Sequence, residues 1–219
     1  MDIEQIKSAL NNENPQERMK GIRELRNCEA DVAAPLLLNH VDDSEFLVRS
    51  FVAMGLGRKQ SDEAFQALLT MSREDKDPNV RAEAANSLSF YGDIVIAHLR
   101  KMYEEDNHWL VRRSIIAVIV DLKCPQELLE ICQIGLQGED EPVMESCLSA
   151  LGLLAGSSQE TAALNLLLSF IEDLSWRIRL QVARSLGRYE NSQAIAALSQ
   201  LKTDPDHRVV GAVLESTIQ

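Results

Sequence analysis

The chain has 219 residues, and its 34 acidic and 22 basic side chains give a formal net charge of −12 at pH 7. A surface this acidic repels a phosphate backbone, so we expect no nucleic-acid partner. The longest apolar interior run, Ile115 to Val120, is far shorter than the roughly 20 residues that a membrane helix needs. Because the opening Met1 to Glu4 lacks the basic start and apolar stretch of a secretory signal, we expect a cytoplasmic protein without membrane insertion.

One slot recurs along the chain at spacings of 31 to 35 residues. Its occupants are Arg18, Arg49, Arg81, Arg112, Met144, Arg179 and Val210. The residues four and seven positions after the slot are mostly small or aliphatic, from Ile22 and Leu25 in the first repeat to Leu214 and Thr217 in the seventh. This spacing places them on one face of a helix.

A second apolar segment precedes the slot in most repeats, and in chain order these segments cover residues 65–71, 94–103, 128–136, 163–171 and 194–201. Each repeat is therefore predicted to be a pair of short helices. Because the pattern covers the whole chain, we expect an all-α fold, a right-handed α-solenoid of about seven helix pairs, as a single domain over residues 1–219. The composition, with 45% apolar but only 5% aromatic residues, suits a thin aliphatic core.

The turns within the repeats carry helix-capping residues. Asn14 before Pro15 and Asp77 before Pro78 are expected to cap second helices, with proline at the first helical position. Glycine follows the apolar stretch of several second helices, and we expect it to end them in the left-handed conformation, at Gly57, Gly92, Gly152 and Gly187.

An acidic residue accompanies the arginine slot, six positions before it. The two sets predict a ladder of ion pairs that is built from Asp43, Arg49, Asp75, Arg81, Asp106, Arg112, Asp173 and Arg179. The fifth repeat has Gly138 and Met144 and lacks both partners, as expected if an unpaired charge in a partly buried stack is costly. The last repeat keeps Asp204 without an arginine, which is plausible if Asp204 serves the arginine of the preceding repeat.

Aromatic residues mark the position three before the slot, at the start of the second helix. Trp109, Trp176 and Phe46 stand there, and large rings could stack on a flat ligand or anchor a partner protein. The alternative is that each ring wedges between neighbouring layers where other repeats have proline. Phe51 and Tyr91 extend the candidate binding set.

Arginines outside the ladder form a second group of candidates, namely Arg113, Arg177, Arg184 and Arg188. Their forked guanidinium groups suit ligand carboxylates, and local salt bridges are the alternative. We identify no metal site, no tightly bound cofactor and no catalytic motif, so the catalytic residues, if the protein is an enzyme, are unknown.

The segments Asp43 to Gly57, Asp75 to Leu88 and Asp173 to Gly187 share an aspartate six residues before a Val-Arg or Ile-Arg pair, small residues, and a closing leucine. This pattern resembles HEAT-like repeats, and the short unit looks most like the phycobilisome lyase family. Within that family the chain is most similar to the NblB type, associated with phycobilisome degradation.

The resemblance implies a protein that binds phycobiliprotein subunits, phycocyanin or allophycocyanin, and promotes detachment of their covalently bound bilin. A phycocyanobilin-type tetrapyrrole is then the expected ligand. Two alternatives stay open: a bilin lyase subunit that attaches or isomerises the pigment, and a protein-interaction scaffold without chemistry. A homodimer is a further assembly left open.

Overall fold

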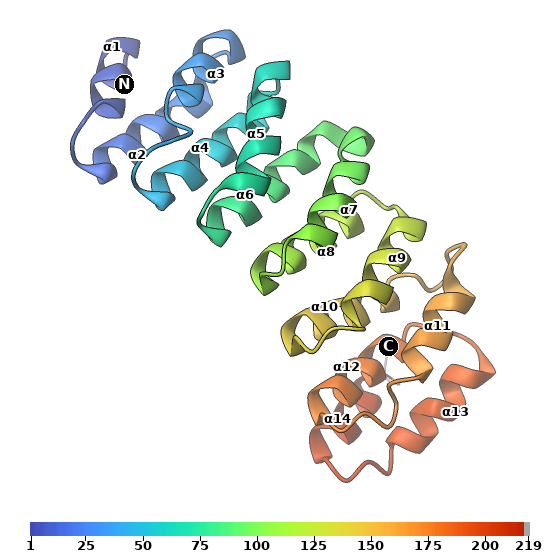
Figure 1. The fold of residues 1–219 in the computed structure, drawn as a ribbon. Helices are drawn as coiled ribbons and strands as arrows, with labels where there is room; N and C mark the ends of the chain where they lie inside the picture. The colour runs from blue at the N-terminus through green and yellow to red at the C-terminus, as the bar shows by residue number, and fades with distance from the viewer. Residues whose placement is uncertain (217–219) are drawn as a thin grey trace. The chain divides into compact units, whose positions relative to one another are not determined.

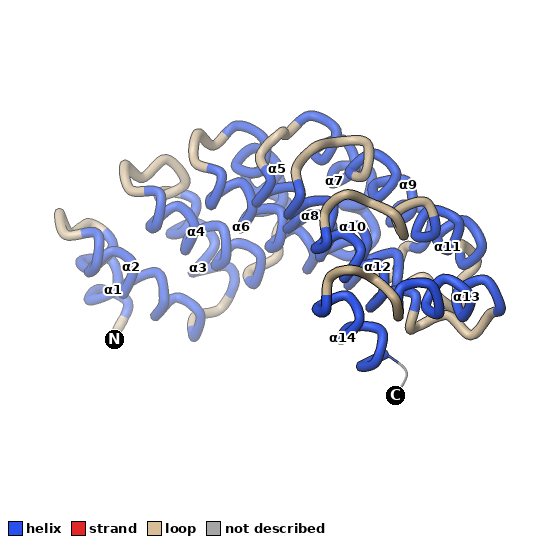
Figure 2. Tube along the Cα trace, turned by 90° about the horizontal axis from the view of Figure 1, so that it is seen from below, coloured by secondary structure: helices blue, strands red, loops and turns tan. Residues whose placement is uncertain are grey.

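The computed structural model describes residues 1–216, and every regular element within that range is helical (Figures 1 and 2). The chain divides into two compact units, Met1–Val118 and Ile119–Gln219. The first unit contains α1 (Ile3–Leu10), α2 (Pro15–Glu24), η1 (Leu25–Asn27), α3 (Ala30–Leu38), α4 (Phe46–Arg58), α5 (Asp62–Glu74), α6 (Pro78–Leu88), η2 (Ser89–Val95), α7 (Ile96–Glu105) and most of α8 (Trp109–Asp121). The second contains the end of α8, α9 (Pro125–Gly135), α10 (Glu141–Gly152), α11 (Glu160–Leu168), α12 (Trp176–Leu186), α13 (Ser192–Leu201) and α14 (His207–Ser216).

The α-helices follow one another as pairs, from α1 and α2 to α13 and α14, and the recurring slot falls in the second helix of each pair. Second helices pack on second helices of the neighbouring repeats: α4 contacts α2 and α6, and α12 contacts α10 and α14. The predicted all-α architecture of successive helix pairs is confirmed. The single domain over 1–219 stays a prediction, and Thr217 lies outside the described residues.

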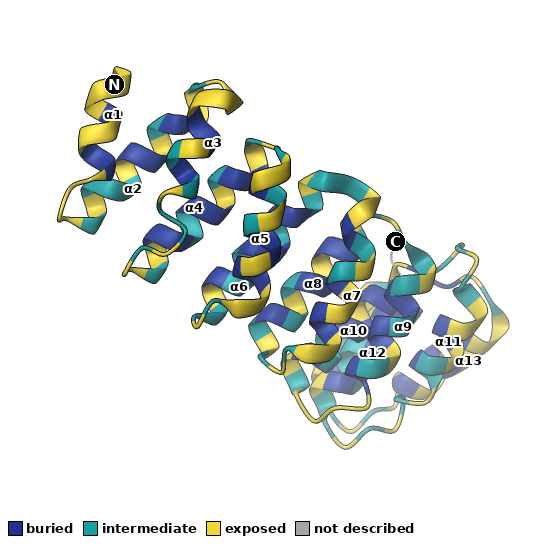
Figure 3. Ribbon diagram, turned by 45° about the horizontal axis from the view of Figure 1, so that its top comes forward, coloured by how far each residue is buried: buried dark blue, intermediate teal, exposed yellow. Residues whose placement is uncertain are grey.

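Buried residues recur along the helices of both units (Figure 3), and most of them are small or aliphatic. The positions four and seven after the slot supply many of them, because both lie on the face that meets the adjacent helices. Within the described chain these positions are fully or almost fully buried at Ile22, Leu25, Ala53, Leu56, Ala85, Leu88, Ile116, Ile119, Leu148, Leu151, Ala183 and Leu186.

The predicted caps form at two of the turns. The Asn14 side chain accepts a hydrogen bond from the Gln16 amide at 2.9 Å, and the Asp77 side chain accepts one from the Asn79 amide at 2.8 Å. Each satisfies a backbone donor that the first helical turn leaves without a partner. Proline follows directly, where its missing N–H costs nothing.

The glycine prediction is wrong at three of its four positions. Gly57 and Gly152 lie inside α4 and α10, and Gly187 follows α12 with φ of −61°. Of the four, Gly92 alone has a positive φ, 69°, and it lies within η2 rather than at the end of α6.

Close packing of consecutive second helices explains the other three glycines. A Cβ atom on Gly57 would lie 2.8 Å from Ser87 Cβ, and one on Gly152 would lie 3.0 Å from Ser185 Cβ. Gly187 faces Ser216 in the same way. The glycines stand eight residues after one slot and the serines six after the next, so each pair lets two second helices approach each other.

Candidate binding surface

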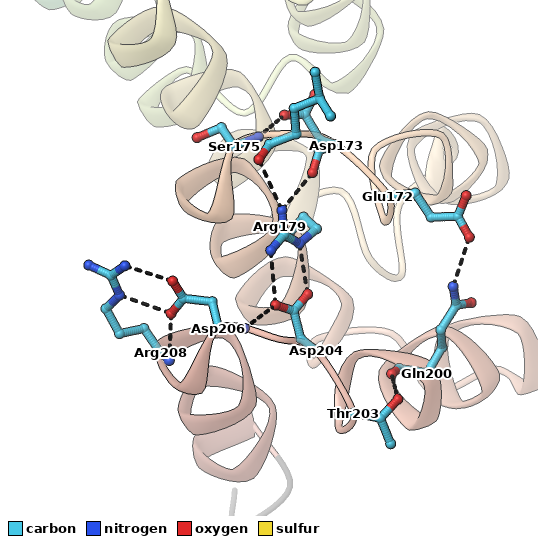
Figure 4. A network of polar contacts seen from close by, with 10 residues as sticks. Glu172, Asp173, Ser175, Arg179, Gln200, Thr203, Asp204, Asp206 and Arg208 are labelled. Carbon is cyan, nitrogen blue, oxygen red and sulfur yellow. Dashed lines mark hydrogen bonds and ion pairs between the residues drawn. The ribbon is translucent and has the colours of Figure 1, made fainter.

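The arginine side chains of the ladder reach the aspartate of the following repeat. Arg49 donates from Nε and Nη2 to Asp75 at 2.6 and 2.8 Å, and from Nη1 to the Asp43 carbonyl oxygen at 2.7 Å. Figure 4 shows the same arrangement around Arg179, which donates twice to Asp204 and once to the Asp173 carbonyl. The other pairs of this kind are Arg18 with Asp43 and Arg81 with Asp106. Each guanidinium fork therefore ties one repeat to the next.

This direction of pairing changes the interpretation of the fifth repeat. Repeat five has Gly138 in the aspartate position and Met144 in the arginine slot. An aspartate and an arginine at these two positions would not pair with each other, because each would pair with a residue of a different repeat. Arg112 donates instead to the Asp106 carbonyl at 2.8 Å and to Asn107, and lies 5.2 Å from the Tyr103 ring centroid. The rationale that repeat five drops both partners of one pair is wrong.

Three of the ladder carboxyls, Asp43, Asp75 and Asp204, have a lowered pKa. Burial raises the pKa of Asp75, but hydrogen bonds from Arg49 and the Asp77 amide, with the charge of Arg49, outweigh burial, so the pKa lies below its ordinary value. The pKa of Asp43 is lowered by the same balance. For Asp204, the hydrogen bond from Arg179 is the largest contribution and lowers the pKa.

Trp109 begins α8 and leaves 41% of its surface exposed. Its ring stacks on His108 with 5.9 Å between centroids, and the Arg113 guanidinium lies 5.7 Å from the ring centroid. A large, partly exposed ring beside a cation is a common composition for a contact surface in protein complexes.

Trp176, at the corresponding position of α12, is in a different environment. The Arg208 guanidinium lies 3.2 Å from its ring centroid and the Arg177 guanidinium 4.7 Å from it. Arg208 is itself held by Asp206 at 2.6 Å. Because cations of its own chain cover the ring, Trp176 offers less surface to a partner than Trp109 does.

The arginines outside the ladder in α12 and just after it are exposed, and two of them are partly neutralised. Arg177 lies 4.0 Å from Glu141, and Arg184 lies 3.6 Å from Glu215. Arg188 is exposed and makes no ion pair within the part of the chain that the structure describes. Arg188 is therefore the member of this group with the most available charge.

The remaining aromatic candidates lie in separate places of the first unit. Phe46 is the first residue of α4 and is half-buried. Tyr91 packs on Phe65 with ring centroids 5.0 Å apart, and its hydroxyl donates to the Ser61 carbonyl at 3.4 Å, which is a packing role. Phe51 lines a groove between α2 and α4 that the slot pattern did not predict.

Two further properties bear on function. Within residues 1–216 no group of three or more His, Cys, Asp or Glu side chains is placed to hold a metal ion. No helix in that range is both long enough and apolar enough to cross a membrane.

Repeated helix pairs whose second helices are joined by an arginine–aspartate ladder define an α-helical repeat protein. The profile of HEAT repeats matches residues 34–119 and 128–217, so the chain belongs to the HEAT-repeat family. Membership in this family favours a protein-binding role. No curated protein sequence matches the chain.

Solved structures show the same fold at low sequence identity. YibA of Escherichia coli has a TM-score of 0.63 at 15% identity, with 100% of this chain and 93% of YibA covered. A chain in the structure of the complex of CpcE and CpcF of phycocyanin lyase from Nostoc sp. PCC7120 has a TM-score of 0.55 at 18% identity, with 99% of this chain and 95% of that chain covered. A mutant of Kap121p has a TM-score of 0.55 at 13% identity, with 98% of this chain but only 28% of Kap121p covered. Likeness at these identities shows the fold alone.

Proposed function

We propose that the chain binds phycobiliprotein subunits and promotes detachment of their covalently bound bilin. The observation that carries the proposal is the fold likeness to a chain of the CpcE and CpcF complex, which extends over 99% of this chain and 95% of the matched chain. The repeat pattern of Asp75 to Leu88 supports the same family relationship from the sequence. Protein recognition is also the role that HEAT repeats favour.

The contact surface that we assign to the phycobiliprotein centres on Trp109 and Arg113 in the first unit. Trp109 is 41% exposed, so its ring has area left to bury against a partner. In the second unit Arg188 offers an exposed guanidinium. Aromatic and arginine side chains dominate the binding energy of many interfaces, which is why these residues are placed at the centre of the proposal.

Detachment as proposed needs no oxidant or reductant. The carbon–sulfur bond of the thioether breaks with its electron pair going to sulfur, which takes up a proton. The neighbouring carbon of the bilin loses a proton, and a carbon–carbon double bond forms. The protein's contribution would be to hold the pigment and its host in a geometry that favours this proton transfer. The released tetrapyrrole would be a transient ligand, and its propionates suit arginine forks.

The test is to mix the purified chain with chromophorylated phycocyanin and, separately, allophycocyanin. Visible absorbance and the pigment that stays covalently bound after denaturation are then followed over time. We expect progressive loss of bound pigment, and a weaker effect for Trp109→Ala. Phe90→Ala is the matched control, because Phe90 is an exposed aromatic side chain of the same unit that lies outside the assigned surface. An equal effect of both variants would contradict the assigned surface.

A lyase subunit is the second candidate, and the two-chain CpcE and CpcF complex is the observation that favours it. In that case the chain would add pigment to an apo-phycobiliprotein subunit, and only with a second HEAT-repeat chain present. Binding without gain or loss of pigment would leave the scaffold role. Absence of binding to either phycobiliprotein would reject the proposed function.

A further inference from the structure

A groove of about 380 Å³ lies within the first unit, between the second helices of repeats one and two. Its walls come from α2 and η1 on one side and from α4 on the other, and Leu37 of α3 also lines it. The apolar lining is aliphatic apart from one ring, and its residues are Ile22, Leu25, Leu37, Phe51 and Met54. This volume lies in the range of pockets that hold small molecules.

The apolar wall on α4 departs from the repeat pattern. Phe51 stands two residues after the slot, where the other repeats have Lys20, Glu83, Ser114, Ser146, Gln181 and Ala212. Met54 stands five residues after it and is 37% exposed. Repeat two therefore presents partly exposed apolar side chains on a helix face where most repeats carry polar or small ones.

Gly55 lets α4 lie close to Leu37 at the floor of the groove. It lines the groove without a side chain, and a Cβ atom there would lie 2.9 Å from both terminal methyl groups of Leu37. Leu37 is fully buried, so the floor below Gly55 is a close-packed aliphatic surface. Leu37 fills the space that a side chain at position 55 would need, so Leu37 closes the groove at this point.

Cationic side chains line the rim of the same groove. Arg23, Arg26 and Arg58 are exposed and make no ion pair within residues 1–216. Lys59, directly after α4, is the fourth cation, and its ammonium group donates to the carbonyl oxygens of Arg26 in η1 and of Cys28, the residue that follows η1. The charge of Arg58 acts on Glu83, whereas no acidic partner of Arg23 or Arg26 is found in the described residues. On a chain with a net charge of −12, these cations around one apolar groove are a local reversal of charge.

We propose that this groove binds a straight-chain fatty carboxylate. The alkyl chain would cover Phe51 and Met54, and the carboxylate would accept hydrogen bonds from Arg23 and Arg26 at the rim. The aliphatic lining suits a flexible alkyl chain, and the unpaired guanidinium groups supply the donors that a carboxylate needs. The proposal stands independently of the phycobiliprotein role, because it uses none of the residues assigned to that contact.

Isothermal titration calorimetry of the full chain with dodecanoate, below the micelle concentration, tests the proposal. We expect saturable binding with one site. Arg23→Gln and Arg26→Gln should each weaken binding about tenfold, since one charge-assisted hydrogen bond is lost in each. Met54→Glu should abolish binding, because it places a carboxylate in the apolar part of the groove. The double variant Arg73→Gln, Arg100→Gln removes two exposed charges of the same unit that do not line the groove, and it should bind like the unaltered chain.

Dodecyltrimethylammonium, with the same alkyl chain and a cationic head, is the ligand control and should not bind. Equal binding of the two amphiphiles would overturn the assigned carboxylate recognition. Absence of dodecanoate binding, or binding that Arg23→Gln and Arg26→Gln leave unchanged, would overturn the proposal as well. Circular dichroism of each variant establishes that any loss of binding occurs in a folded chain.

Discussion

Replacing Asp75 by alanine tests the arginine–aspartate ladder most directly, because Asp75 neutralises the most buried arginine. Arg49 is only 4% exposed, and Asp75 is its sole carboxylate partner within the described residues. The substitution removes the ion pair of this buried charge and leaves only the more weakly acting carboxylates of Asp43 and Asp77 near it. Breaking a buried pair in this way costs about 3–5 kcal/mol. A loss of this size is a large share of the roughly 5–15 kcal/mol by which whole domains are stable.

Asp173→Ala is the matched control. Asp173 and Asp75 both stand six positions before the slot. Asp173 accepts a hydrogen bond from the Ser175 amide at 2.8 Å, and Asp75 accepts the equivalent one from the Asp77 amide at 2.8 Å. The arginine slot of the repeat before it holds Met144, so no ion pair is lost with Asp173. We expect Asp173→Ala to cost about 1 kcal/mol, the usual net value of one hydrogen bond.

Urea denaturation followed by far-ultraviolet circular dichroism measures both variants. The double variant Arg49→Met, Asp75→Ala should recover part of the loss, because methionine fills the space without a charge, as Met144 does in repeat five. If Asp75→Ala lowered the free energy of unfolding no more than Asp173→Ala, the ion pair of Arg49 would contribute no measurable stability, and the reasoning from burial would be refuted.

Three further predictions follow from the same structure. First, the pKa values of Asp43 and Asp75 are lower in the folded than in the unfolded chain. The resulting stability is complete above the unfolded pKa of about 4 and is lost as the pH falls through the pKa values of the folded chain. An acid titration followed by circular dichroism should show this loss of stability, and the loss should be smaller in Asp75→Ala. Second, Gly57→Ala should destabilise by about 1–3 kcal/mol through overpacking, although alanine is the better helix former; a rise in melting temperature would show that the close helix approach is not limiting. Third, Trp176→Leu should lower the melting temperature more than Trp109→Leu, because arginines cover the Trp176 ring; equal shifts would contradict that difference.

The helix pairs could be predicted from the sequence because their signals are local. Apolar spacing after the slot defined the buried face, and Asn14 and Asp77 with their following prolines marked the helix starts. The prediction that the glycines end helices in the left-handed conformation was wrong for a physical reason. A glycine can serve a left-handed cap or a close helix contact, and residues near it in the sequence do not distinguish the two. The serine six residues after the next slot was the signal that could have identified the contact.

The candidate surface was less predictable, because exposure depends on neighbours far along the chain. Trp109 and Trp176 both stand three positions before the slot. Arg208 from the next repeat covers the Trp176 ring, whereas Trp109 is 41% exposed. Phe51 was predicted, but its groove partners Arg23 and Arg26 were not grouped with it. A comparison of repeats at the Phe51 and Met54 positions would have shown an apolar departure from the pattern.

The sequence by itself determined the repeat length, the helix pairs, the small-residue core and the recurrence of an aspartate six positions before an arginine. Each of these depends on spacing along one chain segment. The tertiary structure decided that each arginine pairs with the following repeat, that Gly57 faces Ser87, and that repeat two opens an arginine-lined apolar groove. These features arise where helices of different repeats meet, and the period of a sequence does not state which side chains cross that boundary.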